Sequence, residues 1–211
     1  KAHKNKCECL NKHKFKVDVG KKNAGKLVLY WGAQNQDSNN DILIKNAKNA
    51  YNNFTNSGVS KVNNDGVIDI EICCPQNYRT LAQGELFEKT YFKHFHFVIS
   101  NESLTKWLRQ LYTKIILCKV DYQRLKNMSK NGLYLILNAL PSEYYGREHI
   151  PNSYNLFYKT INKMSVEEVK EWVSYVVENN YPKLHNLIKS RQISLYEIPI
   201  VTYCAHERCN A

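Results

Sequence analysis

Residues 63–72 read Asn-Asn-Asp-Gly-Val-Ile-Asp-Ile-Glu-Ile, a turn signal followed at once by a strictly alternating stretch. Asn, Asp and Gly tolerate the positive φ that tight turns require, so residues 63–66 predict a hairpin turn. In residues 67–72 the apolar side chains recur at every second position, which is the period of a strand with one buried face. Residues 58–62 alternate in the same way before the turn. The stretch therefore favours antiparallel β structure in the first half of the chain.

Three further stretches predict strands around this one. They are residues 27–32, 91–99 and 113–120. The last of them is the most apolar, so we expect it to be buried. Residues 75–88 predict a long loop, and residues 41–54 predict a short helix or an irregular excursion. Strands joined by turns are typical of a small antiparallel β-sandwich, which we place at residues 27–121.

The pattern changes in the second half of the chain. Residues 133–137 predict a short buried strand, and residues 198–203 predict a second one that runs directly into Cys204. Ser165 predicts the N-cap of a helix that carries an apolar stripe at helical spacing. Alternating strands and helices favour an α/β domain with a parallel sheet. We therefore predict an α+β protein of two domains, with the boundary near residues 122–130.

The amino-acid composition indicates which classes of binding partner suit the chain. Thirty basic and nineteen acidic residues give a net charge of +11, which suits an anionic partner such as nucleic acid, although abundant Asn, Lys and Tyr also indicate an AT-rich codon bias. We predict that residues 1–26 form a basic arm. It lacks the clustered Arg and stacking aromatics typical of base contacts, so nucleic-acid binding rests on charge without a motif. No apolar run approaches ~18 residues, so we expect no membrane span.

Seven cysteines are too few for a disulfide scaffold of a chain this long. No pair of C-x-x-C motifs occurs, so a structural zinc site of the usual spacing is not expected. We expect reduced cysteines with one or two reactive members. This expectation favours an intracellular location, either the cytoplasm or the inside of a virus particle.

A candidate nucleophile follows the strand predicted at residues 198–203. Cys204 lies at the carboxyl end of that strand, where parallel sheets bind ligands. The loop behind it consists of Ala205, His206, Glu207, Arg208 and Cys209. Backbone N–H groups of such a loop can surround an anion and lower the pKa of a thiol at its base. The alternative is that Cys204 is an inert thiol at a strand end.

Two segments of the second half share a pattern with a known family. Residues 135–156 contain a strand, an acidic-aromatic stretch and a His-Ile-Pro turn, and residues 199–204 read Pro-Ile-Val-Thr-Tyr-Cys. In this order they resemble a rhodanese-like domain covering residues 128–211. The resemblance implies sulfurtransferase activity, in which Cys204 takes sulfur from a small sulfur-containing anion and passes it from a persulfide to a thiol acceptor.

The same resemblance assigns roles to the loop. Ala205, His206, Glu207 and Arg208 would bind the substrate. Cys209 stands where the family commonly has Arg, so it predicts a resolving thiol that forms a disulfide with Cys204 in a thiol-redox site. The helix that follows this loop in the family would lie beyond Ala211, so we expect a truncated domain.

A second candidate site lies in the first half. Residues 92–98 read Phe-Lys-His-Phe-His-Phe-Val, so the period of a strand places His94 and His96 on one face and the phenylalanines between them on the other. Two histidines at this spacing can share a metal ion. With Tyr78 and Tyr51 upstream, the pattern resembles the intradiol ring-cleavage dioxygenase β-sandwich, which holds ferric iron with two Tyr and two His. The resemblance implies iron at His94 and His96, with Tyr78 as a third ligand and Tyr51 as a fourth; the alternative is a pair of ordinary polar side chains.

Three functions stay open from the sequence. The first is a rhodanese-like sulfurtransferase or thiol-redox protein that uses Cys204. The second is a non-enzymatic structural or interaction protein, with protein partners or self-assembly, built from degenerate enzyme folds and placed in a virus particle. The third is a non-haem metal dioxygenase-like activity at His94 and His96.

Overall fold

The computed structural model describes residues 12–35, 43–81 and 83–205 of the chain. The chain divides into two compact units, Lys1–Lys119 and Val120–Ala211. The division therefore falls just before the predicted boundary. In the described parts, no helix combines the length and the apolar character that crossing a membrane requires.

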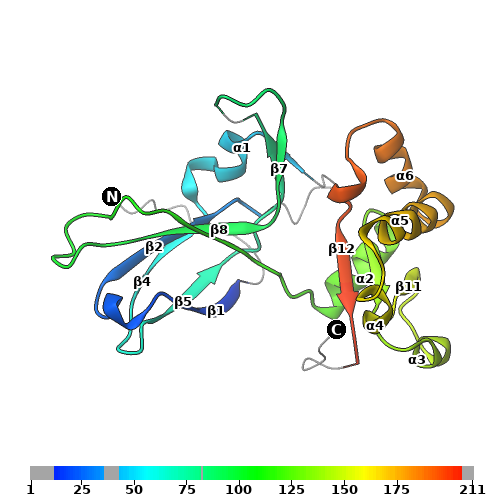
Figure 1. The fold of residues 1–211 in the computed structure, drawn as a ribbon, viewed down its shortest axis with the longest axis horizontal. Helices are drawn as coiled ribbons and strands as arrows, with labels where there is room; N and C mark the ends of the chain where they lie inside the picture. Colours follow the sequence, from blue (N-terminus) through cyan, green and yellow to red (C-terminus); the bar gives the residue numbers. More distant parts are fainter. Residues whose placement is uncertain (1–11, 36–42, 82, 206–211) are drawn as a thin grey trace. The chain divides into compact units, whose positions relative to one another are not determined.

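The first unit is built mainly of antiparallel strands (Figure 1). Its strands are β1 His13–Asp18, β2 Leu27–Gly32, β3 Ile44–Lys45, β4 Ser57–Lys61, β5 Val67–Ile72, β6 Tyr78–Thr80, β7 Lys89–Tyr91, β8 His94–Ile99 and β9 Tyr112–Ile115. Its helices are α1 Ala47–Tyr51 and two single 3₁₀ turns, Lys21–Asn23 and Asn52–Phe54. In the described part of this unit the strands form three sheets, of order β1-β5, β4-β2-β8-β9 and β3-β6-β7.

The core of the first unit lies between the first two of these sheets. The alternating face of β5 contributes Ile68, Ile70 and Ile72, each only 1% exposed. They share one apolar cluster with Phe95 and Phe97 of β8. The sequence predictions of β2, β5 and the buried face of β8 are therefore confirmed, since strand periodicity sets which side chains face the core.

The predicted hairpin at residues 63–66 is wrong, although its turn forms. The N–H of Gly66 donates to the Asn63 carbonyl over 3.0 Å, and the N–H of Val67 donates to Asn63 Oδ1 over 2.8 Å. Gly66 has φ +83°, and a Cβ there would lie 2.3 Å from the carbonyl carbon of Gly20, so only glycine fits. Beyond the turn the strands separate, because β4 pairs with β2 while β5 pairs with β1. The apolar face of β5 is buried against the opposite layer instead of beside β4.

Three further predictions for the first unit need correction. Part of the predicted basic arm is strand β1, which pairs with β5 and carries Lys14 and Lys16 on its exposed face. The predicted strand at residues 91–99 is divided, since β7 ends at Tyr91 and β8 starts at His94. The run at residues 113–120 is not a buried strand: β9 is exposed along its whole length because it is the edge strand of its sheet.

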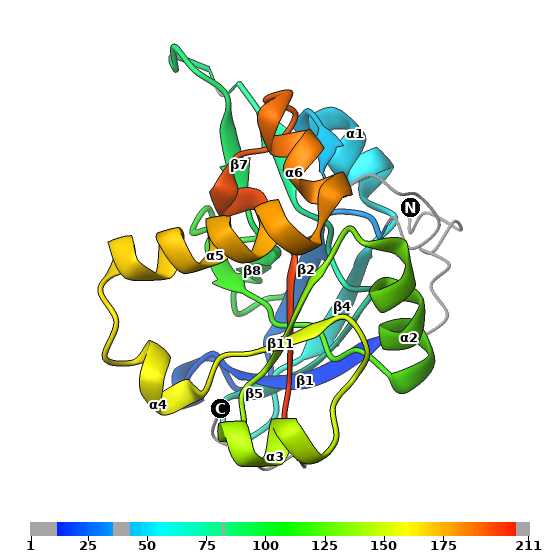
Figure 2. The same cartoon turned by 90° about the vertical axis from the view of Figure 1, so that its right-hand side faces the viewer.

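The second unit contains a three-stranded parallel sheet of order β11-β10-β12, surrounded by helices (Figure 2). This confirms the predicted parallel sheet. Its elements are α2 Tyr122–Asn131, β10 Leu135–Asn138, α3 Ser142–Arg147, β11 Ser153–Asn155, α4 Tyr158–Ile161, α5 Val166–Asn180, α6 Pro182–Lys189, the 3₁₀ turn Leu195–Glu197 and β12 Ile200–Tyr203.

In the second unit the structure confirms the predicted helix cap and the buried strand β10, but it differs from the sequence prediction at β12. Ser165 caps α5 in a reciprocal capping box with Glu168, as the sequence predicts. The central strand β10 is buried at every position. The strand before Cys204 was expected to be buried, but β12 is an edge strand and Ile200 is 51% exposed.

One buried polar side chain ties three segments of the first unit together. Asn56 is 3% exposed. Its Nδ2 donates to the carbonyls of Ala33 and Cys73 over 2.7 and 3.0 Å, and its Oδ1 accepts from the N–H of Cys73 over 3.0 Å. A buried backbone group without a partner is costly, so these bonds hold the end of β2 against the segment that follows β5.

Replacing Asn56 by Ala is expected to lower the free energy of unfolding by about 3 kcal/mol, because three buried backbone groups lose their partner at once. Urea unfolding of the full chain measures this. Asn64→Ala, in the exposed turn, is the matched control and should change stability by less than about 0.5 kcal/mol. Equal stability of the two variants would show that water replaces the Asn56 bonds.

Candidate metal centre

Four side chains that bear lone pairs converge on one point of the first unit. Tyr51 is the last residue of α1, and Tyr78 is the first residue of β6. His94 and His96 lie on β8, on the face turned away from the core. The side chains therefore come from three elements that are distant in the sequence.

The hydroxyl oxygen of Tyr51 lies within hydrogen-bonding distance of a ligand atom on each of the other three residues. Tyr51 Oη lies 3.1 Å from Tyr78 Oη, 3.3 Å from His94 Nε2 and 3.0 Å from His96 Nε2. The two histidine Nε2 atoms are 3.2 Å apart. Atoms that lie about 2.0–2.2 Å from a shared metal ion stand about 2.8–3.6 Å from one another. The spacing of the cluster therefore fits the ligand shell of a single ion.

The far side of each imidazole ring is held by a hydrogen bond. His94 Nδ1 donates to the backbone carbonyl of Phe92. His96 Nδ1 lies 2.7 Å from Thr113 Oγ1, on the neighbouring strand β9, where Thr113 is the register partner of His96. Metal-binding histidines commonly have this second contact, which orients the ring and leaves the other nitrogen for the metal.

Burial sets the protonation of the cluster. Tyr78 and His94 are buried, whereas Tyr51 and His96 are half-buried. Desolvation raises the pKa of Tyr51 and of Tyr78 above the ordinary phenol value. Desolvation, with a smaller contribution from His94, lowers the pKa of His96 to about 4. Near neutral pH His96 therefore has the neutral form that binds metals, and the two phenols keep their protons until a cation displaces them.

Aromatic rings line the half-buried side of the cluster. Trp31 on β2 lies 5.7 Å from the His96 ring, between ring centroids, and 6.3 Å from Phe54. Phe54 stacks on Tyr51 at 5.7 Å while 54% of it is exposed. Residues 52–54 all have positive φ, which is unfavourable for a phenylalanine. Such strained backbone is concentrated at functional sites, and here it presents an aromatic ring beside the cluster.

The structure brings together the residues that the sequence nominated for a metal site. Tyr78, His94, His96 and Tyr51 lie in one cluster. Sequence reasoning missed the supporting residue Thr113 and the aromatic neighbours. Strand register is the signal for two of them, since Trp31 and Thr113 pair with His96 from its two sides.

The site predicted in the second unit is only partly described. Cys204 follows β12, is half-buried and is disulfide-bonded, and Ala205 is exposed. His206, Glu207, Arg208 and Cys209 lie outside the described residues. The two segments with the rhodanese-like pattern are adjacent, because the Tyr203 hydroxyl contacts the Ile150 N–H at 3.1 Å and Ser153 Oγ at 2.9 Å.

The expectation of reduced cysteines is wrong for those cysteines that the structure describes. Cys74 and Cys118 form a disulfide across 44 residues of sequence, and Cys73 and Cys204 are also disulfide-bonded. The spacing of cysteines in the sequence does not indicate the Cys74–Cys118 pair, because that pair depends on how strands from separate sheets come together. Disulfides persist in oxidising surroundings, which argues against the reducing interior on which the intracellular prediction rests.

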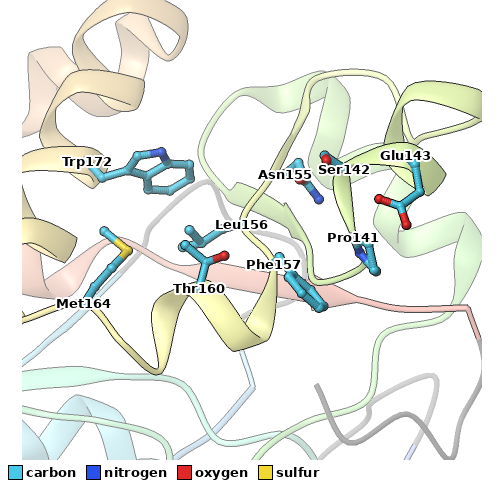
Figure 3. A pocket seen from close by; sticks show the side chains of 9 residues that line it. All are labelled: Pro141, Ser142, Glu143, Asn155, Leu156, Phe157, Thr160, Met164 and Trp172. Atoms are coloured by element: carbon cyan, nitrogen blue, oxygen red, sulfur yellow. The ribbon is translucent and has the colours of Figure 1, made fainter.

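A cavity of about 570 Å³ lies in the second unit beside the carboxyl ends of β10 and β11. Ser142 and Glu143 are at one end of it, and Met164 and Trp172 are at the other (Figure 3). Cys204 is not among its described lining residues. The cavity therefore gives no support to a pocket at that thiol.

Comparison of the chain with protein-family models, with curated proteins and with solved structures gives no match.

In the metal-free protein, stability is expected to fall as the pH is lowered from about 6.5 towards about 4. The unfolded chain protonates His96 at its ordinary pKa of 6.5, whereas the folded chain keeps it neutral until about 4. The unfolded state then binds more protons, with a slope of at most ~1.4 kcal/mol per pH unit from this group. Urea unfolding in the presence of a chelator measures the slope.

His96→Gln should remove this component of the pH dependence, whereas His149→Gln, a change at an exposed histidine of the second unit, should keep it. The same pH dependence in His96→Gln and the unchanged protein would contradict the neutral state of His96.

Proposed function

We propose that the first unit is a non-haem iron protein of the dioxygenase type, with Tyr51, Tyr78, His94 and His96 as ligands. The observation that carries the proposal is the convergence of four ligand atoms at 3.0–3.3 Å. Two phenols and two imidazoles make a donor set suited to ferric iron, since phenolate oxygen is a hard anionic ligand. The resemblance to the intradiol ring-cleavage dioxygenases implies the same ion and the same four residue types.

The proposed substrate class is an aromatic ortho-diol. An intradiol cleavage adds one O₂ to the diol, breaks the ring bond between the two hydroxylated carbons and gives a diacid that contains both oxygen atoms. Ferric iron, when bound, supplies a Lewis acid and a redox partner for this chemistry. Trp31 and Phe54 offer a flat substrate ring aromatic faces on the half-buried side of the cluster.

The ligand residues have separable tasks in this proposal. The phenols of Tyr51 and Tyr78 would each give up a proton on binding a ferric ion, and the phenolates so formed would neutralise two of its three positive charges. His94 is aimed by the Phe92 carbonyl and His96 by Thr113. Because both rings are fixed in advance, little ordering is needed on metal binding.

This proposal has more support than the sulfurtransferase interpretation. A persulfide requires a free thiolate on Cys204, whereas Cys204 is disulfide-bonded in this structure, a state that only the thiol-redox form of that interpretation predicts. The metal cluster needs no rearrangement of that kind. If the experiments below show neither iron binding nor oxygen uptake, the structural or interaction role is favoured instead.

Loading the full chain with ferric iron is expected to give one bound ion per chain and a visible charge-transfer band from the tyrosinate ligands. Tyr51→Phe and Tyr78→Phe should each weaken or shift the band, and His94→Gln should lower iron retention. Tyr112→Phe, at an exposed tyrosine of β9, is the matched control and should leave the band unchanged. If the unchanged protein retains no iron after loading, the four side chains are a hydrogen-bonded cluster only.

The iron-loaded protein is expected to consume one O₂ per aromatic ortho-diol and to place label from ¹⁸O₂ in both carboxyl groups of the product. Phe54→Ala should raise KM about 3- to 10-fold, the effect of losing one aromatic contact, while kcat changes little. Phe87→Ala, at an exposed ring on the loop before β7, is the control. Iron binding without oxygen uptake on any ortho-diol would refute the substrate class and leave the metal site standing.

A further inference from the structure

A second group of potential metal ligands lies elsewhere in the first unit. His13 is the first residue of β1, Cys74 follows the end of β5 and Cys118 follows β9. One ligand atom from each residue lies within 4.8 Å of the other two. The three residues come from separate segments of the chain, so the fold and not the sequence spacing assembles this group.

One of these three ligand residues is buried, and the other two are partly exposed to solvent. Cys74 is 3% exposed, whereas His13 and Cys118 are half-buried. Cys118 packs against the apolar core of the unit. Two sulfurs and one imidazole are the soft and borderline donors that zinc and cuprous copper prefer, unlike the phenolate and imidazole set of the iron centre.

We propose that His13, Cys74 and Cys118 form a redox-gated site for a soft metal ion such as Zn²⁺. In the structure the two sulfurs are joined in a disulfide. A dithiol reductant transfers two electrons to this disulfide, so that the S–S bond breaks, two thiols form and the reductant becomes a disulfide. Metal binding then displaces one proton from each thiol.

The two states exclude each other for geometric reasons. Sulfur ligands about 2.3 Å from a tetrahedral ion stand about 3.8 Å apart, a separation that no S–S bond allows. Among the described residues, these three supply ligands to this site, whereas a tetrahedral zinc ion takes four. The site therefore takes metal only after reduction. A small-molecule disulfide that accepts two electrons from the two sulfurs, and so becomes two thiols, restores the S–S bond and expels the ion.

The site is independent of the proposed iron centre. Its donors share no residue with the four ligands there, and thiolates select a different class of ion. Loss of iron binding in His94→Gln should thus leave the sulfur site intact, so the two proposals fail separately.

Cobalt(II) titration of the reduced full chain tests the proposal. After treatment with excess dithiol and anaerobic exchange, we expect one equivalent of Co²⁺ to give thiolate charge-transfer absorption, which Zn²⁺ then abolishes. The double variant Cys74→Ser with Cys118→Ser should lose this absorption, and His13→Ala should bind Co²⁺ at least tenfold more weakly. His185→Ala is the matched histidine control, and the oxidised protein should show no thiolate absorption.

A second test, alkylation of the protein without substitutions, does not depend on whether the serine variants fold. Zn²⁺ should protect Cys74 and Cys118 of the reduced chain from iodoacetamide, as peptide mass spectrometry reports residue by residue. The proposal is overturned if reduced protein gives no thiolate absorption, if the absorption survives in the double serine variant, if His13→Ala binds as tightly as the unchanged chain, or if Zn²⁺ leaves Cys74 and Cys118 unprotected.

Discussion

The alternation of strand β8 between core and cluster is the constraint on which the rest of the first unit depends. Phe95 and Phe97 are almost fully buried in the apolar core. Because successive side chains of a strand point to opposite faces, their burial holds His94 and His96 on the other face. A slip of one residue would exchange the two sets, so the large apolar surface of the phenylalanines fixes the register of the histidines.

The remaining members of the cluster are positioned by contacts over long stretches of sequence. Tyr51 and Tyr78 arrive on segments that the Asn56 side chain and the Cys74–Cys118 disulfide tie to the layered strands. Once these segments pack against β8, burial of the cluster shifts the pKa values of its side chains. It disfavours the charged forms of Tyr51, Tyr78 and His96, so both phenols keep their protons until a cation compensates the phenolates.

Two donor sets of different chemistry therefore lie in one unit. The phenol and imidazole set is preorganised, since hydrogen bonds already aim both histidine rings. The sulfur and imidazole set is closed by a covalent bond until it is reduced. The difference follows from chemistry, because oxygen and nitrogen ligands can stand in contact without reacting, whereas two adjacent thiols form a disulfide in oxidising surroundings.

The sequence by itself determined the local features: the strands at residues 27–32 and 67–72, the shared face of the two histidines and the cap at Ser165. Each depends on backbone geometry within a few residues, which the order of apolar and polar side chains reveals. Only the tertiary structure decided the partners of β5, the exposure of β9 and the pairing of the cysteines. These depend on which distant strands become neighbours, and burial at an edge or in a centre is a property of that arrangement. The contact between Tyr51 and His96 likewise depends on the tertiary structure. The sequence pattern indicated both residues as candidate ligands, but their 3.0 Å contact forms only when the whole unit folds.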